Sequence, residues 1–233
     1  MDRRHFLRSF AATGVAAGTT ATAGCAGVLG DSGAEGTVLG PPEMDLSEAV
    51  HPSYGDEMPE FTAPDPITGE EISTAQFEGE RAVLWTSFYT NCPDGVCPAL
   101  ILRLRRVQEV AAERGLGDEA AFLPLTFDPE RDTPDVLREY ADQRGVDLDA
   151  GNWHFLRPES YEAGKELMDE HFGLKIEKAY DDENQYERLE YTFQHYGLIL
   201  LVNKRGVVER SYPRGSIVDP ERVVSDFERV VTA

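Results

Sequence analysis

Two cysteines, Cys92 and Cys97, lie where a predicted strand passes into a predicted helix. The stretch Ala82–Phe88 is almost entirely apolar, which is typical of a buried strand. After the cysteines, apolar residues recur at helical spacing as far as Gly115, and Pro98 suits the first position of that helix. The free N–H groups and the positive dipole at a helix start favour thiolate over thiol. The sequence therefore predicts a redox-active or metal-binding thiol pair at this junction.

The rest of the folded region alternates between strand and helix patterns. Two short strands around a turn at Gly69 predict an N-terminal β-hairpin over residues 61–72. Further segments are predicted as strands at 122–127, 153–156, 197–202 and 207–212, and as helices at 134–144, 159–171 and 220–231. This order predicts an α/β fold with a central mixed β-sheet flanked by helices.

The composition is strongly acidic. Asp and Glu number 43 against 22 Lys and Arg, which gives a formal net charge of −21. Such a surface repels nucleic acid and anionic lipid headgroups, so no nucleic-acid partner is expected. A solvated acidic surface suits high salt, where screening removes the self-repulsion, and we therefore expect a halophilic protein. A specific acidic docking face is the alternative.

The N-terminal residues are predicted to be an export signal. Arg3 and Arg4 precede a weakly apolar run, and residues 1–24 resemble a twin-arginine signal peptide. The run ends at Cys25 in a sequence that resembles a lipobox, whose cysteine becomes lipid-modified. An ordinary cleavage site with an incidental cysteine is the alternative. We expect export by the twin-arginine route and a lipid anchor on the outer face of the cell membrane.

The domain boundaries follow from this assignment. Residues 25–58 are rich in Gly, Pro, Ser and acidic residues, which predicts a flexible tether. Residues 59–233 are predicted to form the folded domain. With Cys25 assigned to lipid, Cys92 and Cys97 are the only thiols of that domain.

Three parts of the folded domain resemble the Sco/SenC family. Tyr89–Pro98 is similar to the family's copper motif, Thr126–Pro134 is similar to a second family segment, and His195 occupies the place of the ligand histidine. The acidic composition makes the chain resemble a haloarchaeal member. The resemblance implies a thioredoxin-like fold and a copper-binding metallochaperone. Such a protein delivers copper to, or prepares the cysteines of, the binuclear copper centre of cytochrome c oxidase, whose copper-centre subunit is its partner.

The resemblance also implies roles for individual residues. Cys92, Cys97 and His195 are expected to bind copper, as Cu(I) or Cu(II), and the two cysteines are expected to form a redox disulfide. Thiolates are soft ligands that favour copper(I), and imidazole suits both oxidation states. Tyr89 and Asp128 are expected to lie around the metal ligands.

One departure from the family pattern lies between the cysteines. The family normally has three residues there, whereas this chain has four, from Pro93 to Val96. The wide backbone freedom of Gly95 allows the loop to bulge so that both sulfurs converge.

The main alternative is an exported thiol–disulfide oxidoreductase of the thioredoxin-like type. Those enzymes use two residues between the cysteines and a cis-proline opposite them. This chain has no proline between Pro158 and Pro213, and His195 stands there instead. Zinc also accepts two cysteines and a histidine. We expect a copper carrier rather than a turnover enzyme, with thiol–disulfide reductase activity as the alternative.

Overall fold

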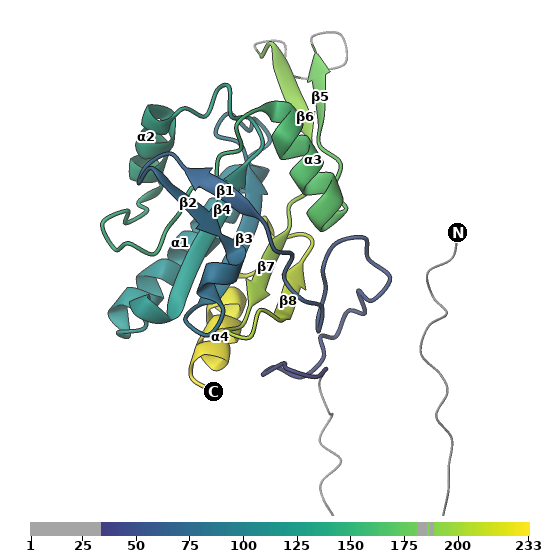
Figure 1. The fold of residues 1–233 in the computed structure, drawn as a ribbon, viewed down its shortest axis with the longest axis vertical. Coiled ribbons are helices and arrows are strands. Elements are labelled where there is room, and N and C mark those ends of the chain that lie inside the picture. The colour runs from purple at the N-terminus through teal and green to yellow at the C-terminus, as the bar shows by residue number, and fades with distance from the viewer. Residues whose placement is uncertain (1–33, 181–185, 187–188) are drawn as a thin grey trace, which may run out of the picture. The chain divides into compact units, whose positions relative to one another are not determined.

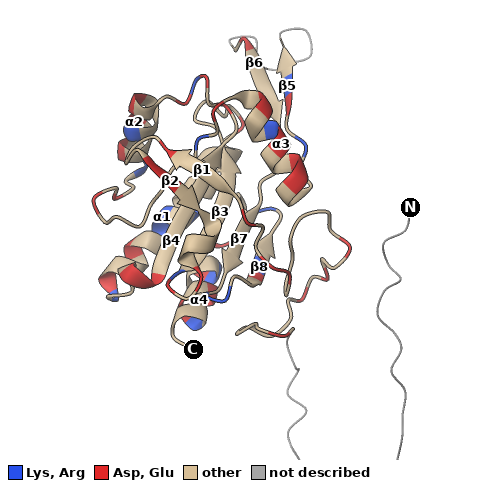
Figure 2. Ribbon diagram, viewed as in Figure 1, with Lys and Arg blue, Asp and Glu red and all other residues tan. Residues whose placement is uncertain are grey.

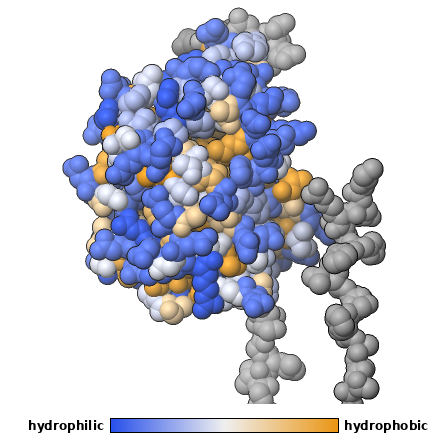
Figure 3. Space-filling view, viewed as in Figure 1, coloured by the Kyte–Doolittle hydropathy of each residue, from blue (hydrophilic) through white to orange (hydrophobic). Residues whose placement is uncertain are grey.

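The computed structural model describes residues 34–180, 186 and 189–233 (Figure 1). The predicted signal peptide and the predicted lipid site at Cys25 lie outside these residues. In the described part of the chain, no helix is both long enough and apolar enough to cross a membrane. On the face drawn in Figure 3, hydrophilic side chains predominate and apolar ones lie in small groups between them.

A mixed sheet forms the centre of the domain, with the strand order β4–β3–β7–β8 (Figure 1). β3 (Ala82–Phe88) pairs in parallel with β4 (Ala120–Thr126) and antiparallel with β7 (Ile199–Val202). β8 (Val208–Tyr212) pairs antiparallel with β7 and closes the other edge. Every residue of β3 and β4 is buried, which explains their continuous apolar sequences. The predicted α/β fold with a central mixed sheet is confirmed.

The outer side of β4 is paired with a less regular segment. Residues 153–156 were expected to form a strand, and they make only two parallel bridges, Phe122 with Trp153 and Leu125 with Leu156. Three backbone hydrogen bonds nevertheless join this segment to β4, and a fourth runs from Phe122 to the preceding Asn152. It therefore covers the edge of β4 although it is too irregular to count as a full strand.

Helices cover both faces of the sheet. Trp85 of β3 stacks on Phe172 of α3 (Tyr161–Phe172), with 3.8 Å between ring centroids, and Phe88 stacks on Tyr140 of α2 (Pro134–Arg144). Strand residues three positions apart point to opposite faces, so α3 and α2 lie on opposite sides of β3. The remaining helices, α1 (Val96–Glu113) and α4 (Pro220–Val231), pack against each other, and α1 also contacts α2.

The predicted N-terminal hairpin is present. β1 (Thr62–Asp65) and β2 (Glu70–Ser73) pair antiparallel, and Gly69 adopts a positive φ of 79° in the turn between them. The short helix η1 (Thr74–Phe77) follows, capped by Ser73, and a second one, η2 (Gly117–Glu119), precedes β4.

A second hairpin, not predicted from the sequence, follows α3. β5 (Glu177–Tyr180) pairs antiparallel with β6 (Tyr191–Gln194), separately from the central sheet. Lys178 lies over the rings of Tyr161 and Tyr191 at 4.5 Å from each centroid, which holds the hairpin against the start of α3. His195 comes directly after β6, so this hairpin determines where the imidazole lies.

The structure corrects one part of the predicted tether. Residues 34–58 were expected to be flexible, yet they lie along β8 and the turn before it. The buried carboxylate of Glu209 accepts the backbone N–H groups of Val38 and Leu39 at 2.7 and 2.9 Å, and Asn203 donates to the Gly36 carbonyl. Leu39 is 1% exposed. We call residues 36–58 the strap; its long-range hydrogen bonds give it an ordered path that local composition does not reveal.

Candidate metal centre

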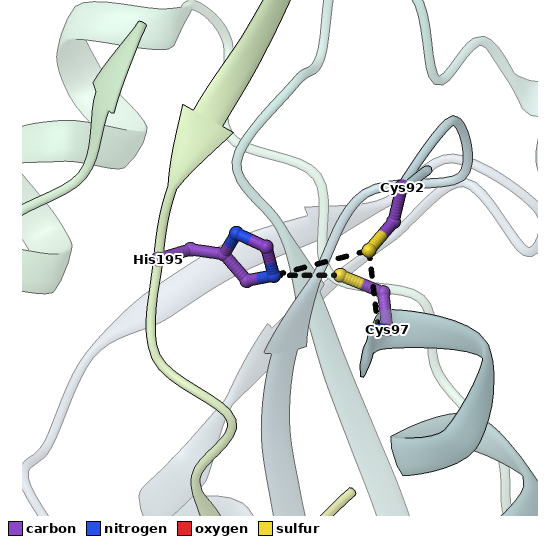
Figure 4. A group of neighbouring side chains, drawn as sticks. All are labelled: Cys92, Cys97 and His195. Carbon is purple, nitrogen blue, oxygen red and sulfur yellow. Dashed lines mark hydrogen bonds between the residues drawn. The ribbon is translucent and has the colours of Figure 1, made fainter. Parts of the chain in front are cut away.

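Three side chains from two distant parts of the sequence converge at one point (Figure 4). His195 Nε2 lies 3.4 Å from Cys97 Sγ and 3.9 Å from Cys92 Sγ, and the three atoms all lie within 4.8 Å of one another. Cys97 is completely buried, whereas Cys92 and His195 are half-buried. The three residues expected to bind metal are therefore brought together by the fold. No other cluster of this kind occurs among residues 34–180, 186 and 189–233.

The cysteine loop converges because of its backbone geometry at Gly95. Gly95 has a φ of 80° and precedes α1, which begins at Val96 rather than at Pro98 as expected. Cys97 thus lies in the first helical turn, where its N–H has no helical partner, and this N–H donates to Cys92 Sγ at 3.3 Å. A residue with a side chain would be strained at this φ, so the four-residue spacing depends on glycine.

The carboxylate of Asp94 completes the loop. Its Oδ1 accepts the Val96 N–H at 2.9 Å and lies 2.8 Å from Cys92 Sγ, whose hydrogen it accepts when Cys92 is protonated. These bonds fold the loop back toward the helix start and direct the sulfur of Cys92 toward Cys97.

The two thiols have opposite protonation tendencies. The hydrogen bond from Cys97 lowers the pKa of Cys92 to about 6; burial opposes this shift, and the bond to His195 reinforces it. Burial raises the pKa of Cys97 well above the usual cysteine value, and the neighbouring Cys92 sulfur raises it further. Cys92 is therefore the thiolate of the pair at neutral pH, and it lies on the more exposed side.

His195 is oriented with its free nitrogen toward the sulfurs. Its Nδ1 lies 3.0 Å from the Phe193 carbonyl, which can only accept, so Nδ1 carries a hydrogen and Nε2 is the nitrogen that faces the sulfurs. Tyr89 meets the imidazole edge-to-face at 5.5 Å between centroids, and Phe127 lies 5.6 Å away. Burial acts to lower the pKa of His195, but its bonds to Cys92 and Phe193 outweigh burial and raise it.

The two residues expected around the ligands lie at different distances from them. Tyr89 is buried and contacts the His195 ring directly, and burial raises the pKa of its hydroxyl. Asp128 makes no recorded contact with the three ligand residues. It accepts the Tyr191 hydroxyl at 2.8 Å and lies 3.4 Å from the Arg131 guanidinium. Because Tyr191 begins β6, the carboxylate of Asp128 is linked to the hairpin that carries His195.

Asp132 is a supporting residue for which no role at the site was predicted. It is fully buried and accepts the backbone N–H of Thr90 as well as the hydroxyls of Thr90 and Thr126. Burial raises the pKa of this carboxyl to about 6, although its bonds to the two threonines oppose the shift. Asp132 thereby ties the start of the cysteine loop to the end of β4. The similarity of Thr126–Pro134 to the family segment was the one signal that pointed to it.

The donor set suits a thiophilic metal ion. For a metal bound at ordinary thiolate and imidazole distances in a trigonal arrangement, sulfur and nitrogen would be about 3.8 Å apart. The observed separations are 3.4 and 3.9 Å, so an ion fits with little movement of the side chains. Two sulfurs and one nitrogen favour copper(I) or zinc over magnesium or calcium, which prefer oxygen ligands.

Comparisons with known proteins identify the fold and the family. Among solved structures, BsSco, a member of the Sco family of cytochrome c oxidase assembly proteins, has a TM-score of 0.59 with 22% identity over 78% of this chain and 96% of its own. Bradyrhizobium japonicum ScoI with copper bound has a TM-score of 0.58 with 20% identity over 75% and 99% of the two chains. The fold is therefore that of the Sco proteins and is thioredoxin-like, as expected. The SCO1/SenC family model matches residues 54–232, and the chain belongs to this family.

A curated relative gives a weaker sequence match. The SCO2-like protein RP587 of Rickettsia prowazekii is 27% identical over 143 residues, which cover 59% of this chain and 60% of the relative's length. The curated matches come from Rickettsia species, so the expected resemblance to a haloarchaeal member is not supported. The acidic composition, on which that expectation was based, is not specific to a lineage.

Proposed function

We propose that this protein is a copper carrier that holds one ion between Cys92, Cys97 and His195. The observation that carries the proposal is the convergence of two sulfurs and the imidazole nitrogen that faces them. The copper-bound state of B. japonicum ScoI, which shares this fold, supports the choice of copper over zinc. Membership of the SCO1/SenC family supports the assembly of cytochrome c oxidase as the process served.

Copper is the ion that the protein transports, and the thiol pair binds it. Copper binding displaces the proton of Cys97, because only thiolates bind the metal and Cys92 is already a thiolate at neutral pH. Oxidation of Cys92 and Cys97 to a disulfide would remove both sulfur ligands, so the redox state of the pair controls loading. The recipient is the copper-centre subunit of cytochrome c oxidase. The expected export signal and a lipid on Cys25 would place the protein on the outer face of the membrane.

Metal titration of the reduced full chain tests the proposal. We expect one tightly bound copper ion per chain, lost in Cys92→Ala and Cys97→Ala and greatly weakened in His195→Ala. His51→Ala is the matched control, because His51 lies in the strap and, among the described residues, its side chain hydrogen-bonds only to the Pro52 carbonyl. Undiminished affinity in His195→Ala would show that the third ligand is wrong. Preference for zinc over copper(I) would reject the copper assignment.

The second candidate is a thiol–disulfide oxidoreductase. The observation that favours it is the pairing of a half-exposed Cys92 of lowered pKa with a buried Cys97, which suits an attacking and a resolving thiol. Copper-free protein that reduces a disulfide substrate with multiple turnovers, and binds no copper, would establish this function instead.

A further inference from the structure

A hollow of about 590 Å³ opens beside the metal centre. It is lined by His195 and Asp94, and on its far side by Gly197, Arg214 and Ile217. Asp94 contacts Cys92 Sγ, so the hollow reaches the centre at two points. Because Cys97 is fully buried behind the helix start, this hollow is a direct approach for a large molecule that exchanges metal with the site.

A second hollow, of about 530 Å³, continues from the first. The two share Pro213, Arg214 and Ile217, and the second extends to Met44 of the strap and to Arg222. Ile217 and Met44 are 73% and 62% exposed, which is unusual for large apolar side chains and supplies apolar contact area along the path. We call the two hollows together the arginine groove.

The groove carries positive charge on a protein of net charge −21. Arg214 and Arg222 are exposed, and neither forms an ion pair with any residue in the part of the chain that the structure describes. Arg210, by contrast, is buried and donates to the Glu209 carbonyl beside Asp226. Figure 2 shows Asp and Glu spread over helices α1, α2 and α3 and the loops, together with Lys and Arg on the same helices.

We infer that the arginine groove binds an extended, acidic segment of the protein that receives the copper. Charge complementarity selects an anionic segment, and Ile217 and Met44 select one with apolar side chains between the acids. The inference rests on the proposed copper function. Arg214, which lines both hollows, is the residue that positions the segment. Its ion pair with a carboxylate of the segment determines where the acceptor thiols lie relative to the metal centre.

The transfer itself is a ligand exchange in which copper keeps its oxidation state. A thiolate of the acceptor forms a sulfur–copper bond as the bond to Cys92 breaks. A second acceptor thiolate then replaces Cys97, and the bond to His195 Nε2 breaks as copper leaves. The acceptor thiols lose their protons as they bind. Cys97 takes up a proton as it is released, whereas Cys92 stays a thiolate. A segment held by Arg214 would present its sulfur from the His195 side of the centre.

The test measures binding of synthetic peptides to the full chain. The probe is a short peptide with two cysteines flanked by aspartates, and its comparison peptide has lysines in place of the aspartates. Docking is measured by fluorescence anisotropy with serine in place of the peptide cysteines, on copper-free reduced protein. We expect Arg214→Glu to weaken binding of the acidic peptide about tenfold, and wild-type binding to weaken as salt rises.

The matched control is Arg205→Glu. Arg205 is exposed at the turn before β8 and lines neither hollow, so this variant makes the same change in net charge elsewhere on the surface. Ile217→Ser, with Leu102→Ser on α1 as its control, tests the apolar contact in the same way. Equal weakening by Arg214→Glu and Arg205→Glu, or equal affinity for the acidic and lysine peptides, overturns the inference.

Copper measurements separate this inference from the proposed function. Arg214→Glu should bind one copper with wild-type affinity yet transfer it to the cysteine-containing acidic peptide more slowly. Wild-type protein that binds no copper but still docks the peptide would reject copper transport and leave the groove as a peptide site. Protein that binds copper while all variants dock alike would reject the groove alone.

Discussion

The two sides of the metal centre are built differently. Cys92 lies in the loop between β3 and α1, and Cys97 lies in the first turn of α1. The inner residues of this strand and this helix are buried. His195 follows a hairpin of two short strands outside the central sheet, held by ring contacts and by Lys178. The difference implies that the sulfurs are fixed by the core, whereas the imidazole is placed by a smaller and less stable unit. Metal affinity can therefore be changed at His195 without unfolding the protein.

The largest expected loss of stability comes from changing the core that supports Cys92 and Cys97. Leu104→Ala removes a fully buried side chain of α1 and should lower the free energy of unfolding by about 2–5 kcal/mol. Denaturant titration measures the loss, and Leu102→Ala, at an exposed position of the same helix, should change it by less than about 0.5 kcal/mol. A loss as small as that of the control would show that the cysteine loop is not supported by the core.

Asp132→Ala should have the next largest effect. It leaves the Thr90 N–H and two threonine hydroxyls without their acceptor, which should cost about 1–3 kcal/mol of unfolding free energy. Because Thr90 starts the cysteine loop, copper affinity should fall as well. Asp132→Asn keeps one acceptor oxygen and should lose less stability and less copper affinity. An unchanged copper affinity in Asp132→Ala would show that Asp132 does not support the cysteine loop.

Tyr191→Phe tests the histidine side. It removes the hydroxyl that binds Asp128, and it should cost about 1 kcal/mol and weaken copper binding severalfold. Tyr180→Phe on the partner strand is the control, since Tyr180 is 56% exposed and should have no effect on copper. If Tyr191→Phe lowered stability and left copper affinity unchanged, the hairpin would not position His195.

The lowered pKa of Cys92 can be measured without changing the stability of the protein. The alkylation rate of Cys92 in copper-free reduced protein should rise with pH and reach half its plateau near pH 6, because the thiolate reacts and its pKa is about 6. An ordinary cysteine reaches this point near pH 8.5. Mass spectrometry identifies the modified residue, and Cys97→Ala should move the midpoint upward by removing the main cause of the shift. A wild-type midpoint near pH 8.5 would show that the pKa of Cys92 is not lowered.

The sequence was sufficient for the core and for the three side chains that converge in the structure. The continuous apolar run Ala82–Phe88, the glycine in the cysteine loop and the helical spacing after it are local signals, and they gave β3, the loop and α1 to within two residues. His195 was placed by resemblance to the family, and the structure brings it to the sulfurs.

What the sequence did not reveal depends on contacts between distant residues. The hairpin that carries His195 has short strands with mixed polar residues, and its stability comes from pairs such as Tyr191 with Asp128. The order of the strap depends on the buried carboxylate of Glu209, more than a hundred residues away along the chain. Neither interaction leaves a periodic pattern in its own segment.

The strap also limits how far the metal centre can travel. A chain free up to residue 58 and anchored at Cys25 could span about 120 Å when fully extended, whereas fastening at Gly36 reduces this maximum to about 40 Å. With the proposed lipid on Cys25, the domain would stay within a thinner layer next to the membrane than a fully flexible tether would allow. The local concentration of the copper centre near a membrane-bound recipient rises as that volume shrinks. Glu209, far from the metal, would thus influence how often donor and recipient meet.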